Sequence, residues 1–303
     1  MGIFKFSKKN LGNLEDADIM EENYKSYYSK SFKLFKKNKE AMVCLFIIIA
    51  LIVVAVFAPF FAPYDPNAQS LAEMLQSPSA KHIFGTDEFG RDILSRIIYG
   101  ARISLSVGVI SQAIASVIGF FMGVMAGYFG GKVDGVISFL IQVFSSFPYL
   151  LFAIALIFVL GPGVFNLFIS LGLLSWAKTA RMIRGQVMQL KKKEYIEACI
   201  INGGSSFRII MKHLLPNCIS TMIVLITLGI PNAIISEASL SFLGLGVQAP
   251  ISSWGSMISL SQPYIRSNPT YSVIPGLAII LIVLSFNIVG DGLRDALDPK
   301  MKS

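Results

Sequence analysis

Long apolar runs alternate with short charged segments along the chain, and this alternation predicts its architecture. The runs without charged residues are 41–64, 103–131, 135–177, 213–236 and 267–290. Because a membrane-spanning helix needs about 20 apolar residues, each run is long enough to cross a bilayer. The run 135–177 has room for two such helices, and the turn Gly161-Pro162-Gly163 divides it into two.

Six membrane-spanning helices are therefore predicted, and the expected fold class is an all-α integral membrane protein. The expected crossings are 41–61, 103–127, 137–160, 164–183, 217–237 and 272–291. The composition agrees, since 54% of the 303 residues are hydrophobic, 15% are charged and the mean hydropathy is +0.65. The first run follows a charged tail and has no small-x-small cleavage pattern. It is therefore predicted to be a retained anchor rather than a secretion signal.

The positions of the basic residues predict that both chain ends face the cytoplasm (N-in, C-in). Of the 26 Lys and Arg residues, 21 fall in segments that this orientation places inside, where membrane proteins are enriched in both. Lys178, Arg181 and Arg184 belong to this inside set, and we interpret them as a topology anchor. The net charge of +8 is then a topology signal with some attraction to anionic membrane lipid. It requires no nucleic-acid partner.

The longest polar interruption between apolar runs, residues 191–217, reads KKKEYIEACIINGGSSFRIIMKHLLPN. The pattern predicts two short helices joined by a hinge at Gly203-Gly204, because glycine tolerates the backbone angles of a sharp turn. A serine, Ser205 or Ser206, is expected to cap the second helix. Pro216 stands where a further helix would begin.

The spacing within this segment resembles the EAA loop of ABC-importer permeases, whose form is E-A-A-x3-G-x9-I-x-L-P. Here Glu197-Ala198-Cys199 is followed after three residues by Gly203, and after nine more by His213-Leu214-Leu215-Pro216. Cys199 replaces the second alanine, and His213 replaces the isoleucine. The resemblance implies a type I ABC-importer permease fold whose loop lies in the cytoplasm and docks into a cleft of an ATPase subunit. An amphipathic loop helix on the membrane surface is the alternative.

The resemblance also implies which residues couple the loop to the ATPase. Glu197 is expected to cap or pair at the docking face, and Gly203 to set the angle between the two short helices. The expected coupling residues are Glu194, Glu197, Ala198, Gly203, Arg208, His213, Leu215 and Pro216.

A second resemblance lies in the external segment between the first two crossings, which contains FGTDEFGRDILSRIIYGARISL. It is similar to the F-G-T-D-x-x-G-R-D segment that precedes the core domain in the peptide and nickel branch of these permeases. The resemblance implies packing at the outer mouth near a docked binding protein, with Asp87, Arg91 and Asp92 as candidate residues. Thr86 or Asp87 is expected to cap a helix from about Glu88. The acidic residues lack the alternating spacing of a calcium-binding loop.

Glu237 ends the fifth predicted crossing, in the segment SEASLSFLGLG, which also matches the peptide and nickel branch. A carboxylate buried in a membrane is a functional candidate by default. A place at the pore mouth and a structural hydrogen-bonding role are both open for it. Trp254, in the following outer loop, is interpreted as an anchor at the membrane interface. The segment from Asn287 to Lys300 is a third match to the family.

No catalytic residue, metal site or ATP site is expected in this chain. Gly130-Gly131-Lys132 lacks the preceding glycine and the following Ser or Thr of a phosphate-binding loop. His82 and His213 lie on opposite sides of the predicted membrane, and the three cysteines imply no disulfide framework. ATP and Mg are therefore expected to bind partner ATPase subunits. The chain is expected to be a transport subunit rather than an enzyme.

Three segments with different roles are predicted: a cytoplasmic polar tail at 1–40, a first helix with an external segment at 41–102, and the core permease domain at 103–303. The resemblance implies an importer of oligopeptides or dipeptides in a bacterial plasma membrane. The implied partners are a second homologous permease subunit in a heterodimer, two ABC ATPase subunits and an extracytoplasmic peptide-binding lipoprotein.

Three other functions compete with peptide import. A nickel-complex importer comes first, because the branch motifs do not separate nickel from peptide permeases. An ion-coupled secondary transporter would need ion-binding groups near the bilayer midplane, and Glu237 alone is available. A membrane anchor without transport activity is the third.

Overall fold

A computed structural model describes residues 29–297, and the regular structure of this range is helical. The predicted polar tail at 1–40 lies mostly outside the described residues, and its last part, 29–37, is helical. The long helices are α2 (Lys39–Val56), α4 (Ile93–Phe129), α5 (Gly131–Ser146), α6 (Tyr149–Leu160), α7 (Val164–Lys191), α10 (Leu215–Phe242) and α12 (Pro269–Leu297). The short elements are α3 (Ala58–Phe61), α8 (Glu194–Ile201), α9 (Ser206–Ile209), α11 (Trp254–Ser261), the 3₁₀ turns η1 (Leu71–Glu73) and η3 (Gln262–Tyr264), and the π-helical turn η2 (Ile210–Leu214).

Within the described range, four helical segments are long and apolar enough to cross a membrane. They are α2, α4, α12 and the continuous segment Ser206–Phe242. The pair α5 and α6 passes the same test as one broken segment. The chain is thus an all-helical membrane protein with four or five apolar spans, and six crossings stay a prediction. α7 is not among these spans, because polar and basic residues interrupt its apolar sequence.

The predicted crossing at 137–160 is divided between two helices. α5 and α6 are bent by 95° relative to each other, with the break at Phe147 and Pro148. Proline has no backbone N–H and disfavours a helical conformation of the residue before it. Phe147 is accordingly extended, with φ −90° and ψ 141°.

The helix α4 joins two elements that the sequence pattern predicts as separate. Its cap is Asp92, whose carboxylate accepts a hydrogen bond from the N–H of Ser95, so the predicted cap at Thr86 or Asp87 is wrong. From there one helix of 37 residues follows, in which no proline breaks the hydrogen-bond ladder. It passes residue 102 without interruption, and a domain division at that point stays a prediction.

α4 packs closely along α7, and small residues make this contact possible. Gly119, Gly123 and Gly127 recur every fourth residue of α4 and face the other helix. A Cβ atom built on Gly123 lies 2.7 Å from the carbonyl oxygen of Ala180 and 2.8 Å from Cβ of Ile183. Small residues at this spacing let helix backbones approach in a membrane, where close packing drives helix association.

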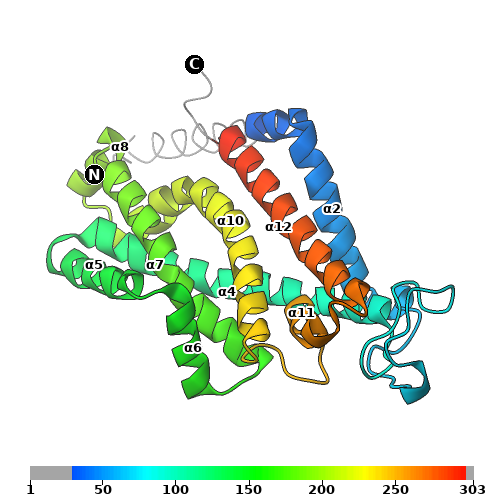
Figure 1. The fold of residues 1–303 in the computed structure, drawn as a ribbon. Helices are drawn as coiled ribbons and strands as arrows, with labels where there is room; N and C mark the ends of the chain where they lie inside the picture. The colour runs from blue at the N-terminus through cyan, green and yellow to red at the C-terminus, as the bar shows by residue number, and fades with distance from the viewer. Residues whose placement is uncertain (1–28, 298–303) are drawn as a thin grey trace, which may run out of the picture.

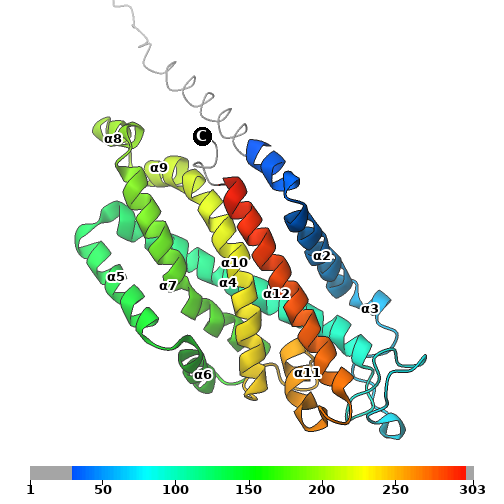
Figure 2. The same cartoon turned by 45° about the horizontal axis from the view of Figure 1, so that its top comes forward.

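The loop and lobe segments gather at two opposite ends of the helix bundle. Figures 1 and 2 both place α8 and α9 near the C-terminal end of α12, whereas α11 and the lobe of residues 62–92 lie at the other end. The predicted coupling loop and the predicted external segment are thus on opposite ends of the molecule. Which end faces the cytoplasm is a separate question, since the structure contains no membrane.

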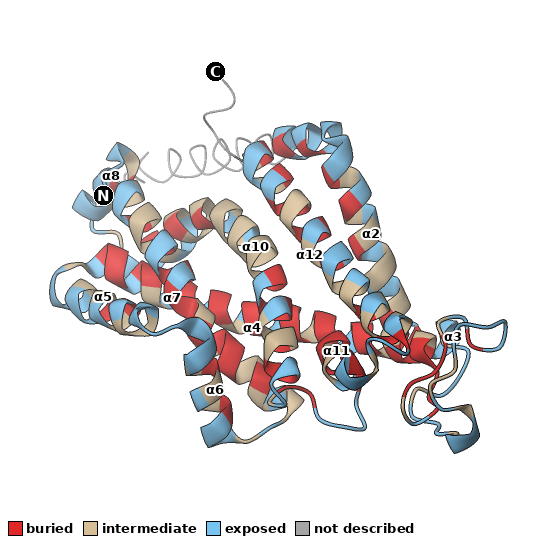
Figure 3. Ribbon diagram, in the orientation of Figure 1, coloured by how far each residue is buried: buried red, intermediate tan, exposed pale blue. Residues whose placement is uncertain are grey.

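α2 lies along α12 at the edge of the bundle in both views (Figures 1 and 2). Its inward face buries Cys44 and Ile48 in a cluster with Ile282 and Phe286 of α12. Its outward face is exposed (Figure 3), and Phe46 alone has 72% of its surface accessible. An apolar face without cover is what a helix against lipid requires.

The interpretation of Trp254 as an anchor at the membrane interface is wrong. Its side chain is buried, and its indole N–H donates to the carbonyl oxygen of Ile97 at 3.1 Å. The backbone of Trp254 also bonds to the hydroxyl of Ser104. The loop after α10 folds back onto α4, so that the tryptophan becomes part of the core.

Candidate functional site

The segment 191–217 forms two short helices with a hinge, as its pattern predicts. Gly203, between α8 and α9, has φ +76°, a left-handed conformation that L side chains rarely adopt. The N–H of Gly204 donates to the carbonyl oxygen of Cys199 at 2.9 Å, which closes the end of α8. Ser205 caps α9 by accepting a hydrogen bond from the N–H of Arg208 at 3.4 Å. We call residues 191–217 the loop hairpin.

The second half of the loop hairpin runs into α10 without a gap. The π-helical turn η2 precedes α10, and Pro216 lies in the first turn of that helix. A proline cannot donate to the preceding turn, and a local π-helical widening accommodates the missing bond. The second half of the loop hairpin and α10 are therefore one continuous helical segment, Ser206–Phe242.

The candidate coupling residues divide into an exposed and a half-buried group. Those on the surface are Glu194, Glu197, Ala198, Gly203 and Arg208. Those half-buried are His213, Leu215 and Pro216. His213 joins the two halves of the hairpin, since its Nε2 lies 3.7 Å from Sγ of Cys199. The exposed group is accessible to a partner, whereas the half-buried group supports the hairpin.

Large apolar side chains stand on the surface of the loop hairpin. Ile201 is 85% exposed and Phe207 is 74% exposed, and Ile200 and Met211 are also on the surface. The apolar residues of the second half are divided between two faces, because Leu214 is buried while Phe207 faces outward. An exposed apolar patch beside charged residues is typical of a protein-binding surface.

The loop hairpin is fixed to the ends of α4 and α7. Ile196, Ile209 and Leu214 are buried in one cluster with residues of both helices, including Val124 and Val187. Two hydrogen bonds add to this apolar contact. Lys191 Nζ donates to the carbonyl oxygen of Tyr128 at 2.7 Å, and Gln186 Nε2 donates to that of Asn217 at 2.8 Å.

The structure contains an ion pair near the base of the loop hairpin that the sequence did not reveal. Arg184 donates from Nε and Nη2 to the carboxylate of Asp134, with Nη2 at 2.6 Å from Oδ2. The pair joins α7 to α5, so Arg184 does more than anchor the topology. Asp134 lies in the first turn of α5, 50 residues before Arg184, and the sequence carries no local signal that the two residues meet.

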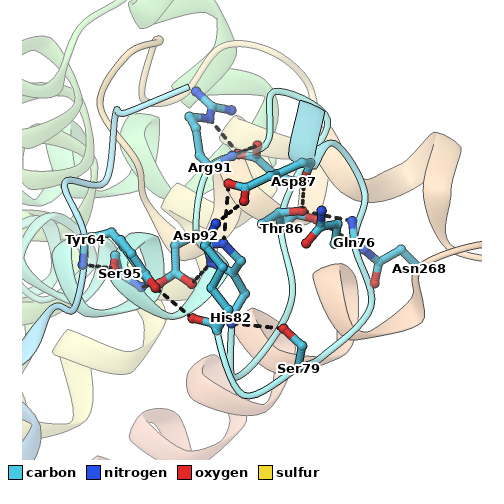
Figure 4. A network of polar contacts seen from close by, with 12 residues as sticks. Tyr64, Gln76, Ser79, His82, Thr86, Asp87, Arg91, Asp92, Ser95 and Asn268 are labelled. Carbon is cyan, nitrogen blue, oxygen red and sulfur yellow. Dashed lines mark hydrogen bonds and ion pairs between the residues drawn. The ribbon is translucent and has the colours of Figure 1, made fainter. Parts of the chain in front are cut away.

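At the other end of the molecule, the F-G-T-D-x-x-G-R-D motif folds into a network of buried polar groups (Figure 4). Asp87 Oδ1 accepts hydrogen bonds from the backbone N–H groups of Phe89 and Arg91, both at 2.9 Å. Its Oδ2 accepts from Nε of Arg91 at 2.6 Å and lies 3.5 Å from Nε of Arg96. Asp87 is thus paired with two buried guanidinium groups.

Asp92 holds the second half of the network. Its Oδ1 lies 2.9 Å from Nδ1 of His82, and its Oδ2 accepts from both the N–H and the hydroxyl of Ser95 at 2.7 Å. The ring of Tyr64 packs on the His82 ring with 4.9 Å between centroids. Figure 4 shows these side chains converging from the lobe and from the start of α4.

A more exposed ion pair borders this network. Lys81 donates to the Glu73 carboxylate, and this hydrogen bond lowers the pKa of Glu73 and raises the pKa of Lys81. Because both groups are accessible to solvent, such a pair adds little to stability. The buried network of Asp87 and Asp92 is therefore expected to stabilise the lobe more than this exposed pair does.

Steric constraints explain why the motif contains glycine at two positions. Gly85 and Gly90 have φ values of +84° and +70°. A Cβ atom on Gly90 would lie 1.9 Å from the carbonyl oxygen of Ser70, which no side chain tolerates. The motif therefore encodes the tight turns and the buried polar network of the lobe. Asp87, Arg91 and Asp92 face its interior, each with 3% or less of its surface exposed, and a role at the outer mouth stays a prediction.

Glu237 is fully buried at the end of α10. Its Oε1 accepts hydrogen bonds from the hydroxyls of Ser241 at 2.6 Å and Ser253 at 2.7 Å. Ser253 also caps α11, so the carboxyl group connects that short helix to α10. Of the two roles left open by the sequence, these contacts favour the structural one.

A cavity of about 950 Å³ lies between α7, α10 and the break that separates α5 from α6. It has apolar walls with many hydroxyl and amide groups. The polar uncharged lining residues are Gln112, Ser145, Ser175, Thr179, Ser220, Thr221, Asn232, Ser236 and Tyr149. Hydropathy alone does not identify these lining residues, because every face of the helices is apolar enough to meet lipid. The signal was there in the serines, threonine and asparagine that interrupt α10.

Comparisons with known proteins match this arrangement. The model of the family described as binding-protein-dependent transport system inner membrane component matches residues 119–303. A second model, the N-terminal TM domain of oligopeptide transport permease C, matches residues 26–78. The first match includes the helices from the second half of α4 to α12, and the second includes α2.

Two relatives from Bacillus subtilis (strain 168) align over most of the chain. The dipeptide transport system permease protein DppC is 46% identical over 288 residues, which are 95% of this chain and 90% of the relative. The oligopeptide transport system permease protein OppC is 40% identical over 290 residues, which are 96% and 95% of the two chains.

The fold also resembles a solved structure, the MetNI methionine ABC transporter in an inward-facing conformation. The TM-score is 0.56 at 19% sequence identity, and the match covers 67% of this chain and 97% of the other. At this identity the likeness concerns the fold alone, and it is that of an ABC-importer permease. The chain therefore belongs to the family of binding-protein-dependent transport system inner membrane components.

Proposed function

We propose that this chain is a transmembrane permease subunit of an ATP-driven importer that carries peptides from an external binding protein into the cytoplasm. Relatives at 46% and 40% identity are named for dipeptide and oligopeptide transport, which supports a peptide substrate. The loop hairpin carries the proposal on the structural side. It presents exposed charged and apolar residues, while its base is fixed to the ends of three long helices.

We place six crossings in the membrane, with α7 as the least apolar of them and the α5–α6 pair as a broken one. Both chain ends and the loop hairpin face the cytoplasm, in keeping with the predominance of Lys and Arg in those segments. Cations such as Lys178 on α7 are then accommodated by a cavity rather than by lipid. The protein is a multi-pass component of a bacterial plasma membrane.

The proposed partners follow from this assignment. A second homologous permease completes a heterodimer, two ATPase subunits bind ATP and Mg, and an extracytoplasmic lipoprotein delivers the peptide. The hairpin enters a cleft of one ATPase, with Phe207 and Ile201 buried in the contact and Glu197 paired at its edge. A large, exposed aromatic residue at the centre of a patch is the usual anchor of such contacts.

Coupling follows from the covalent continuity of the hairpin with α10. When the ATPase subunits close, they displace the hairpin, and the π-helical turn η2 and Pro216 pass this displacement to α10. The pair Asp134–Arg184 and the bond from Lys191 keep α5 and α4 attached to the same base. The helices that line the cavity therefore move together.

The experiment that tests the proposal is purification of the tagged chain from its native membrane, followed by mass spectrometry and peptide uptake in proteoliposomes. We expect a second permease, ATPase subunits and a binding lipoprotein to copurify, and uptake to require ATP. Uptake that survives ATP depletion and collapses with an uncoupler would instead indicate an ion-coupled carrier.

Two substitutions locate the ATPase contact on the hairpin. Phe207→Ser and Glu197→Lys are expected to lower ATPase recovery or to uncouple ATP hydrolysis from uptake, because both side chains are exposed and support no internal packing. Lys132→Gln, an exposed cation outside the hairpin, is the control. Wild-type uptake in both hairpin variants would contradict the coupling role.

A further inference from the structure

The cavity between α7 and α10 contains cations and no acidic group. Lys178 and Arg181 of α7 and Arg294 of α12 line it, and none of the described residues in its wall is Asp or Glu. Lys178 and Arg181 are three residues apart, so they project from the same face of α7. Arg294 comes from a different helix and from a segment more than 100 residues later.

These cations are available to a ligand. In the described part of the chain, neither Lys178 nor Arg294 forms an ion pair, and both are exposed. Arg181 donates to the hydroxyl of Ser145 at 3.1 Å, a neutral partner that leaves its charge uncompensated. By contrast, Arg184, one turn further along α7, is paired with Asp134. The three cations that line the cavity therefore have no acidic partner among the described residues, whereas Arg184, which is not in its wall, has one.

Topology alone does not account for this arrangement. The enrichment of cations on the cytoplasmic side places Lys and Arg at one end of the molecule, but it does not require two helices to direct them into one cavity. Nor does it remove acidic residues from the wall of that cavity. A pocket of one charge sign with low-dielectric walls concentrates ligands of the opposite sign.

Neutral polar groups also line the cavity. Asn232 and Ser236 of α10, Ser175 of α7 and Tyr149 of α6 line it with amide and hydroxyl groups, and the hydroxyls of Tyr149 and Ser175 lie 3.3 Å apart. Ser220 and Thr221 lie towards the loop hairpin, on the same side as Arg294. The cavity thus places neutral hydrogen-bonding groups beside its three cations.

We propose that Lys178, Arg181 and Arg294 form an electropositive site for the carboxylate of the transported substrate, so that the permease itself favours substrates with a free anionic carboxyl end. This inference rests on the proposed function, because it places the substrate in this cavity. A single exposed ion pair supplies about 0.2–1 kcal/mol, which corresponds to at most about a fivefold preference. Weak attraction suits a passage site, since the substrate must also leave.

The test compares a dipeptide with its C-terminal amide in proteoliposomes that contain the complete transporter with its binding protein. The affinity of the binding protein for both peptides is measured separately, and each variant uses the same binding protein. The ratio of acid to amide uptake then changes between variants only through the permease. ATPase activity is recorded in parallel.

In the wild type we expect the acid to be favoured after correction for delivery. Lys178→Gln with Arg181→Gln, and Arg294→Gln separately, are expected to lower the acid-to-amide ratio about two- to fivefold while amide uptake stays near its original rate. Raising the salt concentration is expected to lower the wild-type ratio as well, because these cations are exposed. Lys178→Arg keeps the charge and is expected to keep the ratio. Lys132→Gln removes an exposed cation outside the cavity and is expected to change nothing.

Other outcomes overturn the inference. An unchanged ratio with normal uptake removes the carboxylate site while leaving the importer intact. Equal losses for acid and amide that follow the phosphatidylglycerol content of the vesicles would mean that the cations bind lipid headgroups. If the wild-type complex hydrolyses ATP but takes up neither peptide, the proposed peptide-import function fails, and the site fails with it.

Discussion

At the scale of single residues, Gly203 has the sharpest steric requirement in the loop hairpin. Its φ of +76° excludes most side chains, although the space where a Cβ atom would lie is free of other atoms. A β-branched residue there is strained by its own backbone alone, at a cost of about 1–2 kcal/mol. The residue is therefore selected for its conformation and not for room.

We predict that Gly203→Val preserves membrane insertion and lowers peptide uptake more than ATPase activity. The strain changes the angle between α8 and α9 without removing a buried contact. Gly185→Val is the matched control, because Gly185 on α7 also has free space around it and no positive φ. The measurements are transport per ATP hydrolysed and the amount of protein in the membrane. Equal coupling ratios in both variants would remove Gly203 from the coupling mechanism.

In the lobe of residues 62–92, Asp87 is the residue whose substitution we expect to have the largest effect. It is fully buried and paired with Arg91 and Arg96. A neutral side chain would leave Arg91 with Glu88 alone and remove the acidic partner of the buried Arg96. Breaking one partner of a buried pair costs about 3–5 kcal/mol. We predict that Asp87→Asn loosens the lobe, seen as faster protease cleavage between residues 62 and 92 and a lower Tm in detergent.

The control for this prediction is Asp65→Asn in the same lobe. Asp65 is exposed and only accepts a hydrogen bond from the N–H of Asn67, so its loss should have little effect. A similar Tm for the two variants would mean that the buried network does not stabilise the lobe. A low Tm for Asp87→Asn alone would support the interpretation of the motif as an internal scaffold.

The residue-scale predictions from sequence succeed where a motif depends on local backbone conformation. The hinge at Gly203 and the cap at Ser205 follow from local propensities, and both are present. Long-range partners were not accessible in this way. The pair Asp134–Arg184 joins positions 50 residues apart, and the burial of Trp254 depends on a loop that folds back onto α4. Hydrophobicity alone does not distinguish a tryptophan at the membrane interface from one in the protein core.

At the scale of elements, apolar runs predict where helices lie but not how they are divided. The run that became α5 and α6 has no charged residue from 135 to 160, and Pro148 alone marks its break. Conversely, α4 continues through a polar segment that the hydropathy pattern assigns to the outside. Its N-terminal turns are supported by packing of buried residues such as Ile93 and Arg96 and not by lipid.

The contact of α4 with α7 gives a prediction at this scale. Gly123→Leu would drive a side chain into the backbone of α7, since even a Cβ atom comes within 2.7 Å of the Ala180 carbonyl oxygen. Overpacking of this kind costs about 1–3 kcal/mol. We predict a lower Tm in detergent and weaker attachment of the loop hairpin, whose buried residues pack on the same two helices.

The control is Gly135→Leu on α5, because no atom lies within 4 Å of a Cβ built there. Both substitutions add the same apolar volume to a helix, so their difference isolates the α4–α7 contact. Comparable Tm values for the two variants would show that the helices separate without cost.

At the scale of the whole molecule, the separation of the loop hairpin from the lobe of residues 62–92 permits a direct test of orientation. The two features lie at opposite ends of the bundle in Figures 1 and 2, so labelling of one position at each end determines the topology. Ile83 in the lobe and Lys193 at the start of α8 are both exposed. The native cysteines Cys44, Cys199 and Cys218 are first replaced by serine.

With both termini in the cytoplasm, an impermeant maleimide should label Ile83→Cys in whole cells once the layers outside the plasma membrane have been made permeable to the reagent. Lys193→Cys should react only once the plasma membrane is permeabilised. The physical reason is the concentration of Lys and Arg in the segments around the loop hairpin, which resist transfer across the bilayer. The opposite labelling pattern would place the hairpin outside, where no ATPase can reach it, and would end the proposed coupling mechanism. Labelling of both positions in intact cells would instead show that one of the two segments is not held behind the membrane, and the six-crossing arrangement would have to be redrawn.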